Sequence, residues 1–116
     1  MPGWELIDFK ELDEIKKIFI KSNGVLFAHG FDKRRNFIFR VRKLEKNFSK
    51  FFNCKHSLMT TSGTMAQYVA MKAMGIKPGD EVITQSFTFV ATIEAILAIG
   101  AKPIIIDIDN SYNMDP

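Results

Sequence analysis

The sequence predicts an α/β fold in which two helices precede a β-α-β-α-β segment with parallel strands. Apolar residues recur every three or four positions in the first half, and short apolar runs alternate with helical patterns from His56 onward. Right-handed crossovers make the strands of such a segment parallel and bring their carboxyl ends to one edge of the sheet. We therefore expect the residues that follow the strands to share that edge.

The composition is that of an ordinary globular protein. The 116 residues are 47% hydrophobic and 25% charged, which suits one domain or part of one. Charges interrupt the most apolar region, residues 93–108, so we expect no membrane span, and the acidic first residues do not resemble a signal peptide. The single Cys54 cannot form an intramolecular disulfide. We expect a cytoplasmic protein in which Cys54 is a small core or surface residue.

The first helix is expected to begin at Asp8, because Glu11 follows three places later in a capping-box arrangement. Asn23-Gly24 ends this helix. Residues 25–36 have no clear period and are typical of a loop or a short extended segment. The apolar face of the helix consists of Phe9, Leu12, Ile15 and Phe19.

A second helix is expected over residues 39–52. Nine basic residues and one acidic residue lie between Lys33 and Lys55, with phenylalanines among them. Such a mixture can indicate nucleic-acid binding. A regular apolar stripe instead favours an amphipathic helix with a solvated basic face, so we consider nucleic acid the weaker interpretation. The stripe consists of Val41, Leu44, Phe48 and Phe51.

Three consecutive basic residues, Lys33, Arg34 and Arg35, precede the second helix. They could face the diphosphate of a nucleotide, in the same subunit or across a dimer. A solvated charge run explains them equally well. Both interpretations stay open at the level of sequence.

From residue 56 onward the expected elements alternate regularly. Strands are expected over residues 57–60, 81–86 and 103–108, and helices over residues 64–74 and 89–99. Gly75 and Gly100 close the helices, and Lys77-Pro78-Gly79-Asp80 forms a turn. The run Ile104-Ile105-Ile106 predicts a strand buried on both faces. We divide the chain into an N-terminal helical segment, residues 1–55, and a βαβαβ part, residues 56–116.

The turn after the first expected strand has the pattern of an anion site. Thr61-Ser62-Gly63-Thr64 follows a short apolar run and opens a helix. The first N–H groups of a helix have no intrahelical acceptor, and the helix dipole is positive at that end. Phosphate is the usual ligand of such a turn.

Other chemistries fit the residues less well. Thr60 and Thr64 stand where a Gly-x-Ser-x-Gly elbow around Ser62 requires glycines. No Gly-Lys-Ser or Gly-Lys-Thr supports a Walker-type loop. Two acids at the end of a strand are more typical of caps and turns than of a metal site, so we expect no metal. The acids are Asp107 and Asp109, and His29 and His56 are expected in loops or on the surface.

Four segments, taken in order and spacing, resemble one family closely. They are Thr61-Ser62-Gly63-Thr64, Gly79-Asp80-Glu81-Val82-Ile83-Thr84, Ser86-Phe87-Thr88-Phe89-Val90-Ala91-Thr92 and Gly100-Ala101-Lys102-Pro103. The family is that of the DegT/DnrJ/StrS sugar aminotransferases, and the resemblance covers residues 24–116. It implies the N-terminal part of the large domain of a fold-type I enzyme that uses pyridoxal 5'-phosphate.

The resemblance also implies roles for particular residues. The turn Gly63-Thr64-Met65 would bind the cofactor phosphate through backbone amides and the Thr64 hydroxyl, and Phe89 would stack on the pyridine ring. Taken without the family, Phe89 would be a core aromatic at the start of its helix. Two positions depart from the family pattern, because Met65 replaces the usual alanine and Gln85 the usual proline.

The family's Schiff-base lysine lies further along than residue 116. Lys72, Lys77 and Lys102 belong to a helix, a turn and the start of a strand, so none matches it. We expect no catalytic residue in this chain and no activity of the chain alone. The whole protein would transfer an amino group, typically from glutamate, to a nucleotide-linked keto sugar, as a homodimer. A dehydratase that replaces the lysine, and a non-catalytic nucleotide-binding module, remain alternatives.

Overall fold

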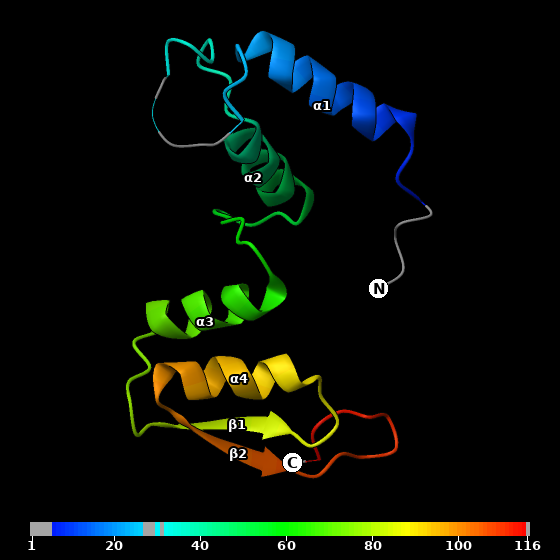
Figure 1. Cartoon of the computed structure of the whole chain (residues 1–116). Coiled ribbons are helices and arrows are strands. Elements are labelled where there is room, and N and C mark those ends of the chain that lie inside the picture. The colour runs from blue at the N-terminus through cyan, green and yellow to red at the C-terminus, as the bar shows by residue number, and fades with distance from the viewer. Residues whose placement is uncertain (1–5, 27–29, 31, 116) are drawn as a thin grey trace. The chain divides into compact units, whose positions relative to one another are not determined.

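A computed structural model describes residues 6–26, 30 and 32–115 of the chain. The fold divides into two compact units, Met1–Leu58 and Met59–Pro116 (Figure 1). In the part of the chain that the structure describes, no helix is long and apolar enough to cross a membrane.

The first unit begins with helix α1, Phe9–Lys21. Asp8 caps it as predicted, because its carboxylate accepts a hydrogen bond from the Lys10 N–H at 2.7 Å and Glu11 accepts one from the Asp8 N–H at 2.8 Å. The chain then turns at Gly24, whose φ is 79°. This reciprocal capping explains why a four-residue pattern was enough to locate the start of the helix.

Helix α2, Arg40–Phe51, agrees with the expected second helix. Its amino end has no side-chain cap. Three apolar residues of the stripe, Val41, Leu44 and Phe48, remain 43 to 51% exposed. The stripe is therefore an open apolar face in this unit rather than part of a closed core.

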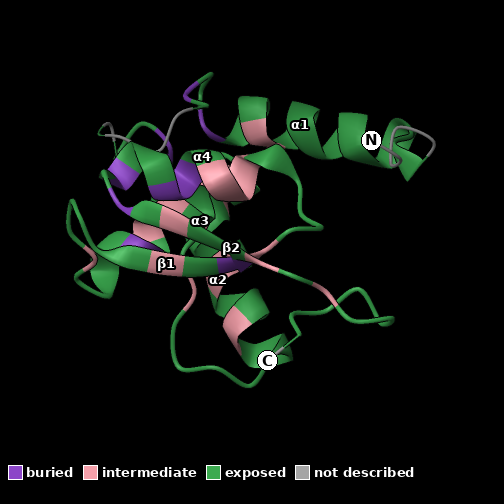
Figure 2. Cartoon of the chain, turned by 90° about the horizontal axis from the view of Figure 1, so that it is seen from below, coloured by how far each residue is buried: buried purple, intermediate pink, exposed green. Residues whose placement is uncertain are grey.

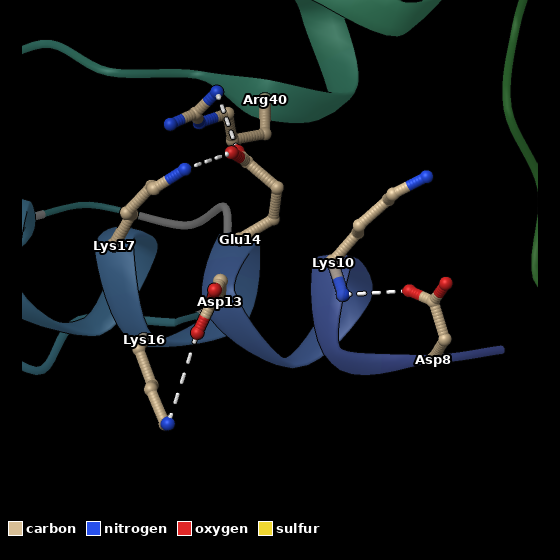
Figure 3. Close-up of polar contacts among 7 residues, drawn as sticks. All are labelled: Asp8, Lys10, Asp13, Glu14, Lys16, Lys17 and Arg40. Atoms are coloured by element: carbon tan, nitrogen blue, oxygen red, sulfur yellow. Dashed lines mark hydrogen bonds and ion pairs between the residues drawn. The ribbon is translucent and has the colours of Figure 1, made fainter.

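A small polar cluster joins the two helices of this unit (Figure 3). Glu14 accepts a hydrogen bond from Lys17 at 2.9 Å and lies 3.8 Å from the guanidinium of Arg40 at the start of α2. The Lys17 hydrogen bond and its positive charge lower the pKa of the Glu14 carboxyl. Exposed pairs of this kind contribute little stability.

Of the predicted surface histidines, His56 is exposed, while His29 lies outside the described residues.

The second unit contains helix α3, Gly63–Ala73, strand β1, Glu81–Gln85, helix α4, Val90–Ile99, and strand β2, Lys102–Ile106. The two strands are parallel, with Glu81 opposite Lys102 and Gln85 opposite Ile106. The helix and strand limits agree with the expected ones within two residues. Gly75 and Gly100 follow the helices with φ of 85°, as predicted.

Helix α4 covers one face of the two-stranded sheet, and α3 packs against α4 (Figure 1). The apolar pattern of α4 explains this arrangement, because three of its residues are at most 3% exposed. Burial of such residues is the main favourable contribution to folding. The core consists of Met71, Ala95, Ile96, Ile99 and Ala101.

The expected strand over residues 57–60 is wrong. These residues form no strand, and the sheet of the described chain contains β1 and β2 alone. A strand exists only where a neighbour accepts and donates its backbone hydrogen bonds. The strand was predicted from the apolar run at Leu58, but no described segment lies beside that run to form backbone hydrogen bonds with it.

The expected burial of Ile104-Ile105-Ile106 on both faces is also wrong. Ile104 is 37% and Ile105 58% exposed, and Ile83 on β1 is 59% exposed. Figure 2 shows exposed and half-buried residues along most of both strands. Among the described elements, only helices on one side cover the sheet, which leaves the other face open.

Candidate functional site

The carboxyl ends of β1 and β2 and the amino ends of α3 and α4 lie at the same side of the second unit (Figure 1). This side is the carboxyl edge of the unit. Three segments meet there, as the parallel topology predicts: residues 62–65, residues 86–89 and residues 107–109. The edge therefore gathers the two segments that the sequence predicts to contact a cofactor, residues 62–65 and 86–89, and the acidic segment 107–109.

The turn at the start of α3 offers two backbone donors. Ser62 is the N-cap, and its hydroxyl accepts a hydrogen bond from the Met65 N–H at 3.1 Å. The N–H groups of Gly63 and Thr64 have no acceptor among the described residues. These two groups and the positive end of the helix dipole suit an anion. Met65 contributes less than expected, because its N–H already has a partner.

The Thr64 side chain is half-buried and lines a hollow of about 290 Å³ between α3 and α4. Its hydroxyl has no hydrogen-bond partner among the described residues. Met65 is 43% exposed beside it. Glu94 of α4 lines the same hollow, and its carboxylate opposes an anion placed deep inside. An anion on this turn is therefore best placed over the first N–H groups of α3.

Phe89 lies at the start of α4, where it is the N-cap residue with extended backbone. Its ring is 79% exposed. A core role for Phe89, the alternative at the level of sequence, does not hold within the described unit. The helix also begins without a side-chain cap and without an acid in its first turn.

The 86–89 turn borders an open hollow of about 590 Å³. Gln85 donates a hydrogen bond from Nε2 to the Phe87 carbonyl oxygen at 2.8 Å. The Phe87 ring packs on Tyr112, with centroids 5.1 Å apart. Sequence reasoning missed both contacts. The hollow is lined by Gln85, Phe87, Thr88, Phe89 and Tyr112.

Tyr112 belongs to the 107–115 loop, which Asp109 holds together. The Asp109 carboxylate accepts hydrogen bonds from the Ser111 hydroxyl at 2.6 Å and from the Ser111 N–H at 2.8 Å. These bonds, with a weaker one from the Asn113 N–H, lower the pKa of Asp109. The prediction that Asp109 is a turn former is confirmed. The Asp-x-Ser pattern is the signal that could have located this loop.

The lysines of the second unit lie at the opposite edge, called the amino edge. Lys72 is in the last turn of α3, Lys77 is in the turn before β1, and Lys102 is the first residue of β2. The carboxyl edge of the described unit therefore carries no lysine.

In the first unit, Lys33, Arg34 and Arg35 occupy different environments. Lys33 and Arg34 are exposed. Arg35 is 6% exposed, donates from Nε to the Ile38 carbonyl oxygen at 3.0 Å, and stacks its guanidinium 4.7 Å from the centre of the Phe39 ring. Arg35 thus has a packing role, which the sequence did not indicate.

Comparison with known proteins gives a consistent result. The model of the DegT/DnrJ/EryC1/StrS aminotransferase family matches residues 36–116. A UDP-2-acetamido-2-deoxy-3-oxo-D-glucuronate aminotransferase of Pseudomonas aeruginosa is 44% identical over 77 residues, which are 66% of this chain and 21% of that protein. The spore coat polysaccharide biosynthesis protein SpsC of Bacillus subtilis is 46% identical over 78 residues, which are 66% of this chain and 20% of that protein.

Solved structures agree. An aminotransferase from Psychrobacter cryohalolentis matches 93% of this chain and 24% of its own, with a TM-score of 0.73 and 30% identity. The Escherichia coli GDP-4-keto-6-deoxy-D-mannose-3-dehydratase with bound hydrated pyridoxal phosphate matches 94% of this chain and 27% of its own, with a TM-score of 0.74 and 26% identity. The chain spans about a fifth of the length of the curated relatives it matches.

Proposed function

Because this chain belongs to the DegT/DnrJ/EryC1/StrS aminotransferase family, we propose that it forms the start of the cofactor site of a pyridoxal-phosphate-dependent sugar aminotransferase. The observation that carries the proposal is the meeting of two features at the carboxyl edge. One is the pair of backbone donors at Gly63 and Thr64, and the other is the exposed ring of Phe89. Pyridoxal phosphate has two matching parts, a phosphate that the backbone donors could bind and a flat aromatic ring on which Phe89 could stack.

The residues present fit this group. The Gly63 and Thr64 N–H groups and the Thr64 hydroxyl would hold the phosphate, whose negative charge the start of α3 stabilises. Met65 would contribute through the helix dipole, because Ser62 already accepts its N–H. Phe89 would pack its face on the pyridine ring. When bound, the cofactor supplies an electron sink for amino transfer.

We also propose the substrates and the assembly. The amino acceptor is a nucleotide-linked keto sugar and the donor is glutamate, in a homodimer located in the cytoplasm. A relative whose name describes amino transfer to a UDP-linked 3-oxo sugar supports the acceptor class. The exposed apolar faces of α1 and α2 support a subunit interface, and the exposed, unpaired Cys54 suits a reducing compartment.

The exposed side chains of Lys33 and Arg34 are the better candidates for the substrate diphosphate, because Arg35 is buried. A KM measurement tests this in the whole protein that carries the chain. Changing Lys33 and Arg34 to alanine is expected to raise the KM for the nucleotide sugar and leave that for glutamate unchanged. An unchanged sugar KM contradicts the assignment.

A dehydratase is the second candidate function, favoured by the likeness to the GDP-4-keto-6-deoxy-D-mannose-3-dehydratase at 26% identity. An assay of the whole protein with a keto sugar nucleotide separates the two. Amino sugar formed with loss of glutamate supports the aminotransferase, and a deoxy sugar supports the dehydratase.

Thr64→Ala tests the proposed cofactor site. The change removes a charge-assisted hydrogen bond, so we expect cofactor affinity to fall about tenfold, equivalent to about 1.4 kcal/mol. Thr64→Ser keeps the hydroxyl and should retain most of the affinity. Absorbance titration measures binding and a thermal melt of the cofactor-free protein measures stability. A lower melting temperature with unchanged affinity would show that Thr64 is only structural.

We further propose that the 116 residues alone transfer no amino group. Transamination needs an amine at the site that forms a covalent bond to the cofactor, and the three lysines of the second unit lie at the amino edge. Borohydride reduction after incubation with pyridoxal phosphate should leave no stoichiometric adduct on one lysine. A single fully labelled lysine that supports turnover contradicts the proposal.

A further inference from the structure

We propose that Gln85 and Tyr112 are positioning residues that fix the 86–89 turn from two sides and so set the orientation of Phe89. The inference rests on the proposed function, in which Phe89 contacts the cofactor ring. Neither residue needs to touch the ligand. Both act through Phe87, Gln85 by a hydrogen bond to its carbonyl oxygen and Tyr112 by packing on its ring.

The first support is a hydrogen bond inside the turn. The half-buried Gln85 side chain donates from Nε2 to the Phe87 carbonyl oxygen at 2.8 Å. Backbone hydrogen bonds hold both ends of the turn. At its start the Ser86 N–H donates to the Ile106 carbonyl at 2.9 Å, and at its end the Phe89 carbonyl accepts from the Thr92 N–H at 3.0 Å. Within residues 85–89 of the described chain, the Gln85 carboxamide makes the only hydrogen bond from a side chain to the backbone.

The second support is the Tyr112 ring, which packs on Phe87 with an interplanar angle of 41°. Tyr112 has a φ of 63°, a left-handed conformation that a bulky residue adopts only when its surroundings impose it. The Tyr112 N–H donates to the Asp109 carbonyl at 3.0 Å, and the Asp109 N–H donates to the Asn113 carbonyl at 3.0 Å. The loop is therefore built to hold this ring against Phe87.

These supports matter because Phe89 has little packing of its own. A ring that is 79% exposed has few contacts of its own to restrict its rotamers, so ordering it when a ligand binds costs conformational entropy. A turn held at Phe87 limits the directions that the neighbouring Phe89 ring can take before binding. Pre-organisation of this kind improves affinity by reducing the ordering cost.

Gln85 offers an informative rescue variant. In a parallel ladder alternate residues bond to a given neighbour, and here the Ser86 N–H rather than the Gln85 N–H donates to Ile106. Proline at position 85 therefore loses no bond to β2. It also fixes its own φ, which restricts the start of the turn without a carboxamide.

The test measures cofactor affinity and the state of Phe89 in the whole protein that carries this chain. Gln85→Glu removes the donor and Tyr112→Ala removes the ring, and each should raise the dissociation constant of pyridoxal phosphate about fivefold. Gln85→Pro and Tyr112→Phe should stay within about twofold of the wild type. The matched control Gln67→Glu, on the exposed surface of α3, should change nothing.

A second readout needs no cofactor. Fluorine NMR of 4-fluorophenylalanine at position 89 should show a ring signal that Gln85→Glu and Tyr112→Ala shift toward the free amino acid, while Gln85→Pro and Tyr112→Phe leave it in place. Phe89→Leu separates the two proposals. If it weakens binding while Gln85→Glu and Tyr112→Ala change neither readout, the inference is overturned and the proposed function stands. If it leaves binding unchanged, the assignment of Phe89 falls, and the inference with it.

Discussion

The two edges of the sheet in the second unit use their backbone groups in opposite ways. At the amino edge the Gly79 N–H donates to the Gly100 carbonyl at 2.9 Å, and the Lys102 N–H donates to the Asp80 carbonyl at 2.8 Å. At the carboxyl edge the N–H groups of Gly63 and Thr64 have no acceptor among the described residues. One edge is closed by its own hydrogen bonds, while the other has two N–H groups without an acceptor in the described part of the chain.

The difference extends to packing. A Cβ on Gly100 would lie 3.0 Å from the Pro78 Cβ, so this position of the amino edge leaves no room for a side chain. Phe87 and Phe89 at the carboxyl edge are 62% and 79% exposed. Under the proposed function, the amino edge stabilises the unit and the carboxyl edge also binds the cofactor, so substitutions of Gly100 and Thr64 should affect different measurements.

Gly100→Ala should have the largest effect on stability. The alanine would have to adopt a φ of 85°, which costs about 1 to 2 kcal/mol, and the contact with Pro78 should add about 1 to 3 kcal/mol. Gly75→Ala is the matched control, since Gly75 has the same φ and no atom within 4 Å of an added Cβ. Urea unfolding measures both. Equal losses for the two variants would show that the contact with Pro78 contributes nothing.

Ser62→Ala should separate stability from binding within the carboxyl edge. Loss of the N-cap hydroxyl, which accepts the Met65 N–H, should lower the free energy of unfolding by about 0.5 to 2 kcal/mol. Thr64→Ala should change stability little and affect cofactor affinity. The pair is measured by unfolding and by absorbance titration. If Ser62→Ala leaves stability unchanged, the hydroxyl does not act as a cap.

Acid should loosen the 107–115 loop, the smallest of the three effects. The pKa of Asp109 is lowered by its hydrogen bonds from Ser111, so its contribution is present above the ordinary value of 3.8 and is lost as the pH falls through the lowered one. NMR of the two tyrosines measures this, because Tyr112 reports the loop and Tyr68 the core. The Tyr112 signal should change first, and Asp109→Asn should abolish that early step. Simultaneous change of both signals contradicts the prediction.

Local signals in the sequence located most of the fold. The pair Asp8 and Glu11 marked the start of α1, and Gly75 and Gly100 marked the ends of α3 and α4, because caps and left-handed residues depend on their own neighbours in the chain. The shared edge followed from the parallel topology. The sequence therefore predicted that residues 62–65 and 86–89 lie at one edge of the second unit, as they do in the structure.

The remaining features depend on partners distant in sequence. Residues 57–60 have the composition of a strand but no described neighbour to pair with. Ile104 has the pattern of a buried strand, but it shares a face with the exposed Ile83, which no second layer covers. The packing of Phe87 on Tyr112 joins residues 25 positions apart. No period or motif encodes such a contact.

The open face of the sheet has a consequence for handling the protein in solution. Ile83 and Ile104, which lie opposite each other in the strand register, present aliphatic surface to water at 59% and 37% exposure. Contiguous apolar surface on a sheet promotes association that increases with concentration. Light scattering of the 116-residue chain should therefore rise with concentration, and polar substitutions at these two positions should extend the range over which the sample stays clear.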